Sequence, residues 1–198
     1  MREICHDNKT TWPDTISRVG FLFALFLIIL IFIVPEPGLA ATVEYTLTIE
    51  KASVNLTGKP ASAMTINNSI PGPVLRFKEG DTARIHVRNA MDLETSIHWH
   101  GVLVPPGMDG VPFISFPPIA PGATFTYEFS IRQNGTYWYH SHTNIQEQFG
   151  VYGAIVIEPV EISHHPDRDY VVLFSDWTDE DPHEILRTLK RGSEWYAL

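Results

Sequence analysis

The chain has 198 residues, 44% of them hydrophobic and 12% aromatic, which is typical of a globular core rather than of a disordered protein. Its formal net charge of -9 disfavours a nucleic-acid partner, because an acidic surface repels the phosphate backbone. The single cysteine, Cys5, excludes a disulfide framework and leaves residues 42–198 without the thiolate ligand that some copper and zinc sites use.

The N-terminal region contains an apolar run of fourteen residues at positions 21–34. This run is shorter than the roughly 20 residues needed to span a bilayer, but it fits the hydrophobic region of a secretory signal. Arg18 precedes the run, and small residues at 38–41 offer a cleavage site. We therefore predict a signal peptide over residues 1–41 and an exported protein. An uncleaved N-terminal anchor is the alternative, because the segment before the run is long and its charges are balanced.

From residue 42 the pattern changes to short strands separated by turns. Residues 43–50 and 124–131 alternate apolar and polar side chains with the period of two that marks a half-buried strand. Further strands are expected at residues 63–66, 74–77, 81–89, 96–100, 136–140 and 153–158. Such a series, with regular turns and no helical period, predicts an all-β fold, a Greek-key β-sandwich over residues 42–160.

The composition changes again after residue 160. Residues 161–169 are predicted to be a linker. The adjacent histidines His164 and His165 would point to opposite sides of an extended chain, so a linker is favoured over a metal site there.

A short structured segment is expected after this linker. Residues 170–174 are apolar and predict a buried strand, and residues 183–190 predict a helix that Asp181 caps with Pro182 at its first position. One strand and one helix cannot bury a core alone. We therefore interpret residues 170–198 as the start of an incomplete second domain.

Two His-x-His pairs lie within the β-rich region: His98 with His100, and His140 with His142. Because side chains on a strand alternate between faces, each pair is expected to project both imidazoles to one side. Neutral imidazole is the most common metal ligand among side chains. The two pairs together predict a metal site.

The residues around these pairs narrow the choice of metal. His100 is followed by apolar residues at 101–104 and by no acidic residue where a metallo-hydrolase or cupin site would place one, and no thiolate is near. A site rich in imidazole suits copper, zinc, iron or nickel. Four histidines also exceed the three protein ligands of an open catalytic zinc site. The alternative is that the histidines are inert, hydrogen-bonded members of a β core.

Four motifs in combination resemble the first cupredoxin domain of the multicopper oxidases. These motifs lie at residues 96–101 (SIHWHG), 108–112 (MDGVP), 135–142 (GTYWYHSH) and 146–153 (QEQFGVYG). Residues 173–180 resemble the opening of the second domain in the periplasmic copper-resistance oxidases of bacteria. The resemblance covers about residues 43–198. It implies a cupredoxin fold and, with the leader, a periplasmic location.

The resemblance implies a role for individual residues. His98 corresponds to a ligand of the type 2 copper, and His100, His140 and His142 correspond to ligands of the paired type 3 coppers. Asp109 corresponds to the acidic residue that helps to deliver protons to reduced oxygen. A simpler interpretation is that Asp109 only begins a β-turn, and the two interpretations are compatible.

The resemblance also implies an activity, the copper-dependent oxidation of a substrate such as Cu(I) or a phenol coupled to reduction of O₂ to water, with a role in copper resistance. The complete family site takes as many histidines again from a C-terminal cupredoxin domain, which also holds a type 1 copper on a cysteine. Residues 42–198 contain neither this C-terminal cupredoxin domain nor a cysteine. We therefore expect a partial trinuclear cluster that is inactive alone, in a fragment, a truncated product or one half of a split enzyme with a complementing chain.

Two alternative functions remain open from the sequence. The chain could be a stand-alone exported module that binds or sequesters copper. It could also be an inert assembly domain with a cupredoxin-like fold, in which case replacing His100 and His142 would not change its copper content.

Overall fold

The computed structural model describes residues 40–161 and 166–192. Nearly all of the predicted signal peptide, as well as His164 and His165 of the predicted linker, lies outside the described residues. Among the residues that are described, no helix combines the length and the apolarity needed to cross a membrane.

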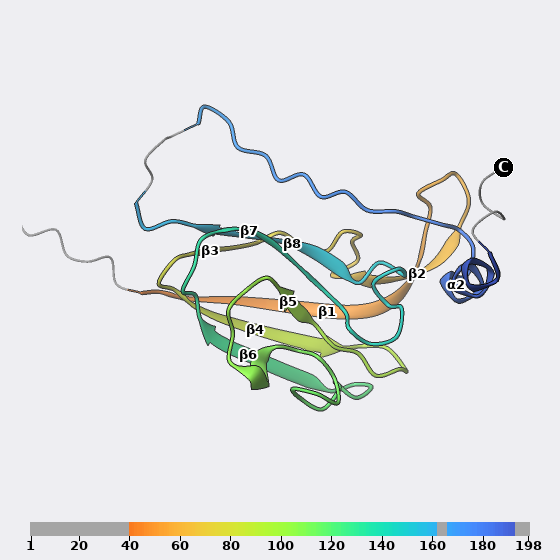
Figure 1. Cartoon of the computed structure of the whole chain (residues 1–198), viewed down its shortest axis with the longest axis horizontal. Helices are drawn as coiled ribbons and strands as arrows, with labels where there is room; N and C mark the ends of the chain where they lie inside the picture. The colour runs from red at the N-terminus through yellow and green to blue at the C-terminus, as the bar shows by residue number, and fades with distance from the viewer. Residues whose placement is uncertain (1–39, 162–165, 193–198) are drawn as a thin grey trace, which may run out of the picture. The chain divides into compact units, whose positions relative to one another are not determined.

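The first of two four-stranded sheets has the strand order β2-β1-β4-β6 (Figure 1). Its strands are β1 (Thr42–Val54), β2 (Ala61–Ile66), β4 (Thr82–Asn89) and β6 (Thr124–Ser130). The two longest strands of this sheet, β1 and β4, pair in parallel, whereas β1 with β2 and β4 with β6 are antiparallel. The sheet is therefore mixed, with distant parts of the chain side by side.

The second sheet has the order β3-β8-β7-β5. Its strands are β3 (Leu75–Lys78), β5 (His98–His100), β7 (Gly135–His140) and β8 (Tyr152–Glu158). Strand β3 pairs in parallel with β8, and the other neighbours are antiparallel. Each of the eight strands expected within residues 42–160 is present, so the prediction of an all-β sandwich is confirmed. The short strand β5 stands at the edge of this sheet and carries the first histidine pair.

The core lies between the inner faces of the two sheets. On β4, the alternate residues Ala83, Ile85 and Val87 have no exposed surface, as the period of two predicts. The largest buried side chains include Trp99 and Tyr127, whose rings meet edge to face with centroids 5.0 Å apart. Trp99 is thus held in the core, which turns its two histidine neighbours on β5 to the opposite face.

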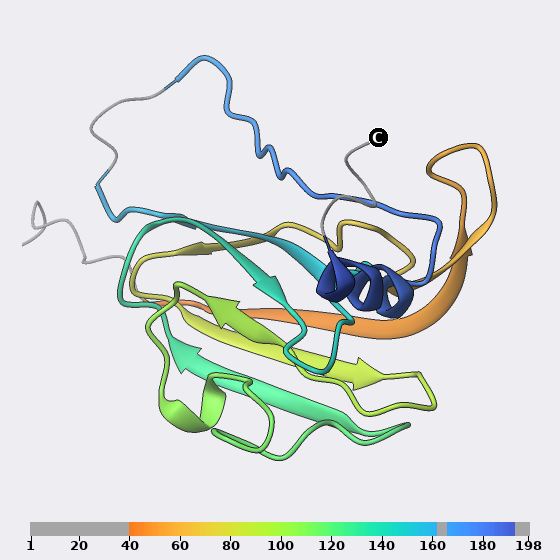
Figure 2. The same ribbon diagram turned by 45° about the vertical axis from the view of Figure 1, so that its right-hand side comes forward.

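The prediction of a buried strand at residues 170–174 is wrong. These residues form no strand (Figure 2), and their side chains Tyr170, Val172 and Phe174 are 73%, 69% and 92% exposed. The segment is extended, with Val171 and Leu173 half-buried, and it lines a cavity of about 520 Å³ together with residues of β7 and β8. An apolar run forms a buried strand only where other strands pair with it and cover it, and within the described residues none does.

The predicted helix is present as α2 (Pro182–Arg191). Asp181 caps it, because its carboxylate accepts a hydrogen bond from the His183 backbone N–H at 2.9 Å. Pro182 occupies the first turn, where its missing N–H costs nothing. A 3₁₀ turn, η1 (Pro106–Met108), lies between β5 and β6 and leads into Asp109.

Candidate metal centre

The pairing of β5 with β7 brings histidines from both motifs together. In the antiparallel register His98 lies opposite His140, and His100 lies opposite Trp138. Residues opposite each other in neighbouring strands point to the same face. The residues between them, Trp99 and Tyr139, have no exposed surface and lie in the core. The histidines therefore gather on the outer face of this sheet, as the strand period predicts.

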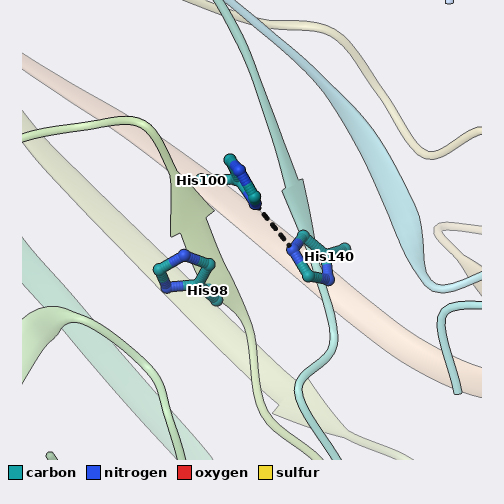
Figure 3. Close-up of side chains that lie close together, drawn as sticks. All are labelled: His98, His100 and His140. Atoms are coloured by element: carbon teal, nitrogen blue, oxygen red, sulfur yellow. Dashed lines mark hydrogen bonds between the residues drawn. The ribbon is translucent and has the colours of Figure 1, made fainter. Parts of the chain in front are cut away.

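Three histidines offer ring nitrogens to a common point. One nitrogen from each of His98, His100 and His140 lies within 4.8 Å of the others (Figure 3). The closest approach joins Nδ1 of His100 to Nε2 of His140, at 3.2 Å. Zinc–imidazole bonds of about 2.0–2.1 Å place two nitrogens on one ion roughly 3–4 Å apart, and copper is of comparable size. The spacing of His100 and His140 thus suits a shared metal ion.

His142 lies beyond the end of β7, in the following loop. Its ring centroid is 4.9 Å from that of His98 and 5.1 Å from that of His140, so it belongs to the same patch of imidazoles. It is not one of the three histidines with converging nitrogens. Its backbone N–H donates to the Ser96 hydroxyl at 3.0 Å, which ties the loop to the segment before β5.

His98 has a well-defined partner for the ring nitrogen that faces away from the cluster. Nδ1 lies 2.7 Å from the backbone carbonyl of Asp109, and a carboxylate oxygen of Asp109 lies 3.4 Å from the same nitrogen. A proton on Nδ1 leaves the lone pair on Nε2 for a metal. Asp109 therefore lies next to His98, at the edge of the candidate centre.

The turn after Asp109 is pressed closely against β5. Gly110 has a φ of +77°, and a Cβ at this position would lie 1.7 Å from the carbonyl oxygen of Ile97. Only glycine fits there, both in conformation and in space. The turn is therefore a tight one, and it is also the feature that fixes Asp109 beside His98.

His140 has an acidic partner that the sequence analysis did not single out. Its Nδ1 lies 2.9 Å from a carboxylate oxygen of Glu147 and 3.1 Å from the backbone carbonyl of Ser141. Glu147 lies within the motif at residues 146–153, and this was the sign in the sequence that it belongs near the site. Nothing in a linear motif indicates, however, that a turn brings this side chain back onto the end of β7.

Burial disfavours the charged form of two of the imidazoles, those of His140 and His142. It lowers the pKa of His140 to about 4 and also lowers the pKa of His142, and the neighbouring histidines add repulsion against a second positive charge. Burial also raises the pKa of the Glu147 carboxyl. At neutral pH, His140 therefore has a free lone pair. An all-imidazole donor set fits copper, zinc, iron or nickel, whereas magnesium and calcium prefer oxygen ligands.

Trp138 packs directly on two of these imidazoles. Its ring stacks on His140 with centroids 4.1 Å apart and planes 14° apart, and on His100 at 4.9 Å and 30°. Trp138 therefore covers the imidazoles, whereas Trp99 lies on the opposite, core-facing side of β5.

A buried polar network supports the loop that carries His142. Gln146, only 3% exposed, accepts hydrogen bonds from Thr95 at 2.7 Å and from Ser141 at 2.9 Å. Its amide group donates to the Glu94 carbonyl at 2.8 Å. The network joins the segment before β5 to the loop after β7. Sequence reasoning missed Gln146, because a lone glutamine gives no sign that it is buried.

Comparison with known proteins gives a consistent result. The sequence model of a family described as multicopper oxidase matches residues 48–161. Copper resistance protein A of Pseudomonas syringae pv. tomato is 52% identical over 163 residues, which cover 82% of this chain and 27% of that protein. The protein of the same name from Escherichia coli is 53% identical over 156 residues, covering 77% and 26%. The chain thus spans about a quarter of the length of these relatives.

Solved structures show the same likeness in three dimensions. A multicopper oxidase from Pseudomonas thermotolerans has a TM-score of 0.60 and 36% identity, covering 63% of this chain and 31% of that chain. A laccase from Botrytis aclada has a TM-score of 0.63 and 37% identity, covering 77% and 29%.

Proposed function

The chain belongs to the multicopper oxidase family, a family of oxidoreductases, and from this premise we propose that residues 42–160 are the first cupredoxin domain of an exported copper-dependent oxidase. The observation that carries the proposal is the convergence of imidazole nitrogens from His98, His100 and His140 on one face of the second sheet. The proposal includes the domain limits of the sequence analysis: a leader at 1–41, a linker at 161–169, and the start of a second domain at 170–198.

Each histidine has a proposed metal. We assign His98 to the type 2 copper and His100, His140 and His142 to the type 3 pair. The short distance between His100 and His140 supports a shared ion for these two residues. The His142 ring lies within about 5 Å of the His98 and His140 rings, centroid to centroid, which supports its inclusion in the same centre.

Bound copper in this family supplies the electrons that reduce O₂ to water. The residues of the chain prepare the site for that chemistry. His98 and His140 each engage Nδ1 with an acceptor, which directs Nε2 to the centre. The Asp109 carboxylate, which is partly exposed, can hold a proton 3.4 Å from the His98 ring and exchange it with water. Trp138 covers one side of the imidazoles and limits the access of solvent.

The physiological role is proposed from the names of the relatives. Two copper resistance proteins, each more than half identical over the matched region, support a role in copper resistance. Cu(I) or a phenol is the proposed reducing substrate, and the hydrophobic leader supports a periplasmic location. The formal net charge of -9 disfavours a nucleic-acid partner.

The full reaction needs groups that these 198 residues do not contain. Their one cysteine is Cys5, in the leader, so a type 1 copper has no thiolate ligand here. We propose that the residues supply half of the trinuclear ligands and require a C-terminal cupredoxin region for turnover. An oxidase assay of the 198-residue chain, with a phenol and with Cu(I), is expected to show no activity. Sustained turnover would contradict this part of the proposal.

Copper titration tests the site itself. The full chain is expected to bind copper at micromolar concentrations, and His100→Ala and His140→Ala should each weaken binding by at least about tenfold, because each removes a converging nitrogen. His86→Ala is the matched control. His86 lies on β4 in the other sheet, bonded to Thr126 and Glu44, and its loss should leave copper binding unchanged. Absence of specific binding by the native chain would refute the proposed function.

A stand-alone copper-binding module is the second candidate. It is favoured by the fact that three nitrogens already converge without any other chain. Co-expression with the C-terminal region of a related copper resistance protein separates the two functions. Oxidase activity of the mixture supports a shared cluster, whereas tight copper retention without activity supports the module.

A further inference from the structure

The acidic partner of His140 lies outside the set of residues that the family resemblance assigns. The Glu147 carboxylate is 2.9 Å from Nδ1, and the imidazole it meets has only 7% of its surface exposed. The opposite ring nitrogen, Nε2, faces His100. Glu147 therefore contacts the back of a candidate ligand and does not itself point into the candidate centre.

The two best-placed histidines differ in their outer partners. The nearest acceptor to Nδ1 of His98 is a backbone carbonyl at 2.7 Å, and the Asp109 carboxylate is more distant, at 3.4 Å. At His140 the order is reversed, because the Glu147 carboxylate is closer than the Ser141 carbonyl at 3.1 Å. A carboxylate acceptor carries charge and makes a stronger hydrogen bond than a neutral carbonyl. An acidic neighbour can therefore raise the donor strength of His140 more than that of His98.

The backbone holds Glu147 in this position. Gln146 is fixed by its buried side-chain hydrogen bonds to the segment before β5. The N–H of Gly150 donates to the Glu147 carbonyl at 3.0 Å, and the N–H of Phe149 donates to Gln146 at 3.1 Å. The next side chain in the turn, Gln148, is exposed, so the same turn offers a matched position without this contact.

We propose that Glu147 is a positioning residue for His140: its carboxylate holds the proton on Nδ1, directs the Nε2 lone pair toward His100, and makes this imidazole a stronger metal donor. The identity of the metal as copper rests on the proposed function, whereas the effect on the imidazole does not. Removal of such an outer partner typically weakens metal binding by about 10–100-fold.

Nuclear magnetic resonance of the metal-free full chain tests the contact directly. At one fixed neutral pH, the Nδ1–H proton of His140 should resonate far downfield in the native chain, as expected for a carboxylate acceptor. It should move upfield in Glu147→Ala, and Glu147→Gln should give an intermediate position because the amide keeps an acceptor but loses the charge. The control Gln148→Ala should match the native chain. An unchanged resonance in Glu147→Ala would overturn the proposal.

Copper affinity, measured by competition with a chromophoric chelator, provides the second readout. Glu147→Ala is expected to weaken binding by about 10–100-fold, Glu147→Gln by less, and Gln148→Ala not at all. If the native chain binds copper and Glu147→Ala binds it equally well, the proposal is wrong although the proposed function stands. If the native chain binds no copper, the proposed function fails, and the Nδ1–H resonance of His140 alone tests the role of Glu147. If Glu147→Ala does not fold, Glu147→Gln, which keeps the shape of the side chain, replaces it in both measurements.

Discussion

At the scale of single residues, the core and the candidate centre are separated by the alternation of side chains along β5. Trp99 points into the core, whereas His98 and His100 on either side of it point to the outer face. A substitution on one face of β5 therefore need not disturb the other face. The buried aromatic residues on the core side include Tyr127, which accepts a hydrogen bond from the Ile97 N–H, and Tyr139, which donates to the Pro73 carbonyl. Their titration offers a test of the core that is independent of any metal.

Alkaline pH should destabilise the fold through these two tyrosines. Burial raises the pKa of Tyr127 and of Tyr139 above the usual value of about 10. Above about pH 10 the unfolded chain releases protons that the folded chain keeps, so this stability is fully present below that pH and is lost as the pH rises. Urea unfolding at pH 8 and pH 11 should show a lower midpoint at pH 11.

Single variants identify the tyrosines responsible. Tyr127→Phe should reduce the dependence of the urea midpoint on pH, because the variant has one fewer buried phenol to titrate. Tyr170→Phe should retain the full dependence, since Tyr170 is largely exposed. Equal pH dependence in Tyr127→Phe and the native chain would show that the buried phenol does not contribute.

At the scale of elements, the structure shows which features a sequence pattern can predict. The period of two was sufficient to place His98 and His100 on one face, because alternation is a local property of a strand. Glu147 and Gln146 could not be recognised in the same way, since their roles depend on a turn that folds back onto another segment. Residues 170–174 illustrate the same limit: their apolar character is local, but burial requires a neighbour.

The loop after β7 should depend strongly on Gln146. Gln146→Leu conserves volume but leaves the hydroxyls of Thr95 and Ser141 and the Glu94 carbonyl without this partner in the interior. Buried groups without a partner cost about 1–3 kcal/mol each, so the loss of these three hydrogen bonds should lower the free energy of unfolding by at least about 3 kcal/mol. Chemical denaturation measures it. Gln148→Ala, at an exposed position in the same turn, should change stability by less than about 0.5 kcal/mol.

At the scale of the whole molecule, the candidate metal centre depends on parts of the chain that are far apart in the sequence. His98 and His140 lie opposite each other because β5 pairs with β7. An unfolded chain cannot offer the same set of nitrogens, so metal binding should be linked to folding. A ligand that binds only the folded state at a hundred times its dissociation constant adds about 2.7 kcal/mol of stability.

Copper should therefore raise the thermal stability of the full chain, and a chelator should reverse the gain. Differential scanning calorimetry with and without copper measures the shift in Tm. Magnesium at the same concentration is the control, because an all-imidazole site is unsuited to it. His140→Ala should lose most of the copper-induced shift. A shift that persists in His140→Ala would place the binding site elsewhere.

The stack of Trp138 on His100 and His140 has a practical consequence for spectroscopy. An indole in contact with two imidazoles will lose its fluorescence when a paramagnetic ion such as Cu(II) binds to them, while Trp99 in the core will be affected less. The chain thus contains its own optical probe. Quenching of the emission should report copper binding by His100 and His140 in real time and without any label. Trp138→Phe, which lacks this indole, is the control.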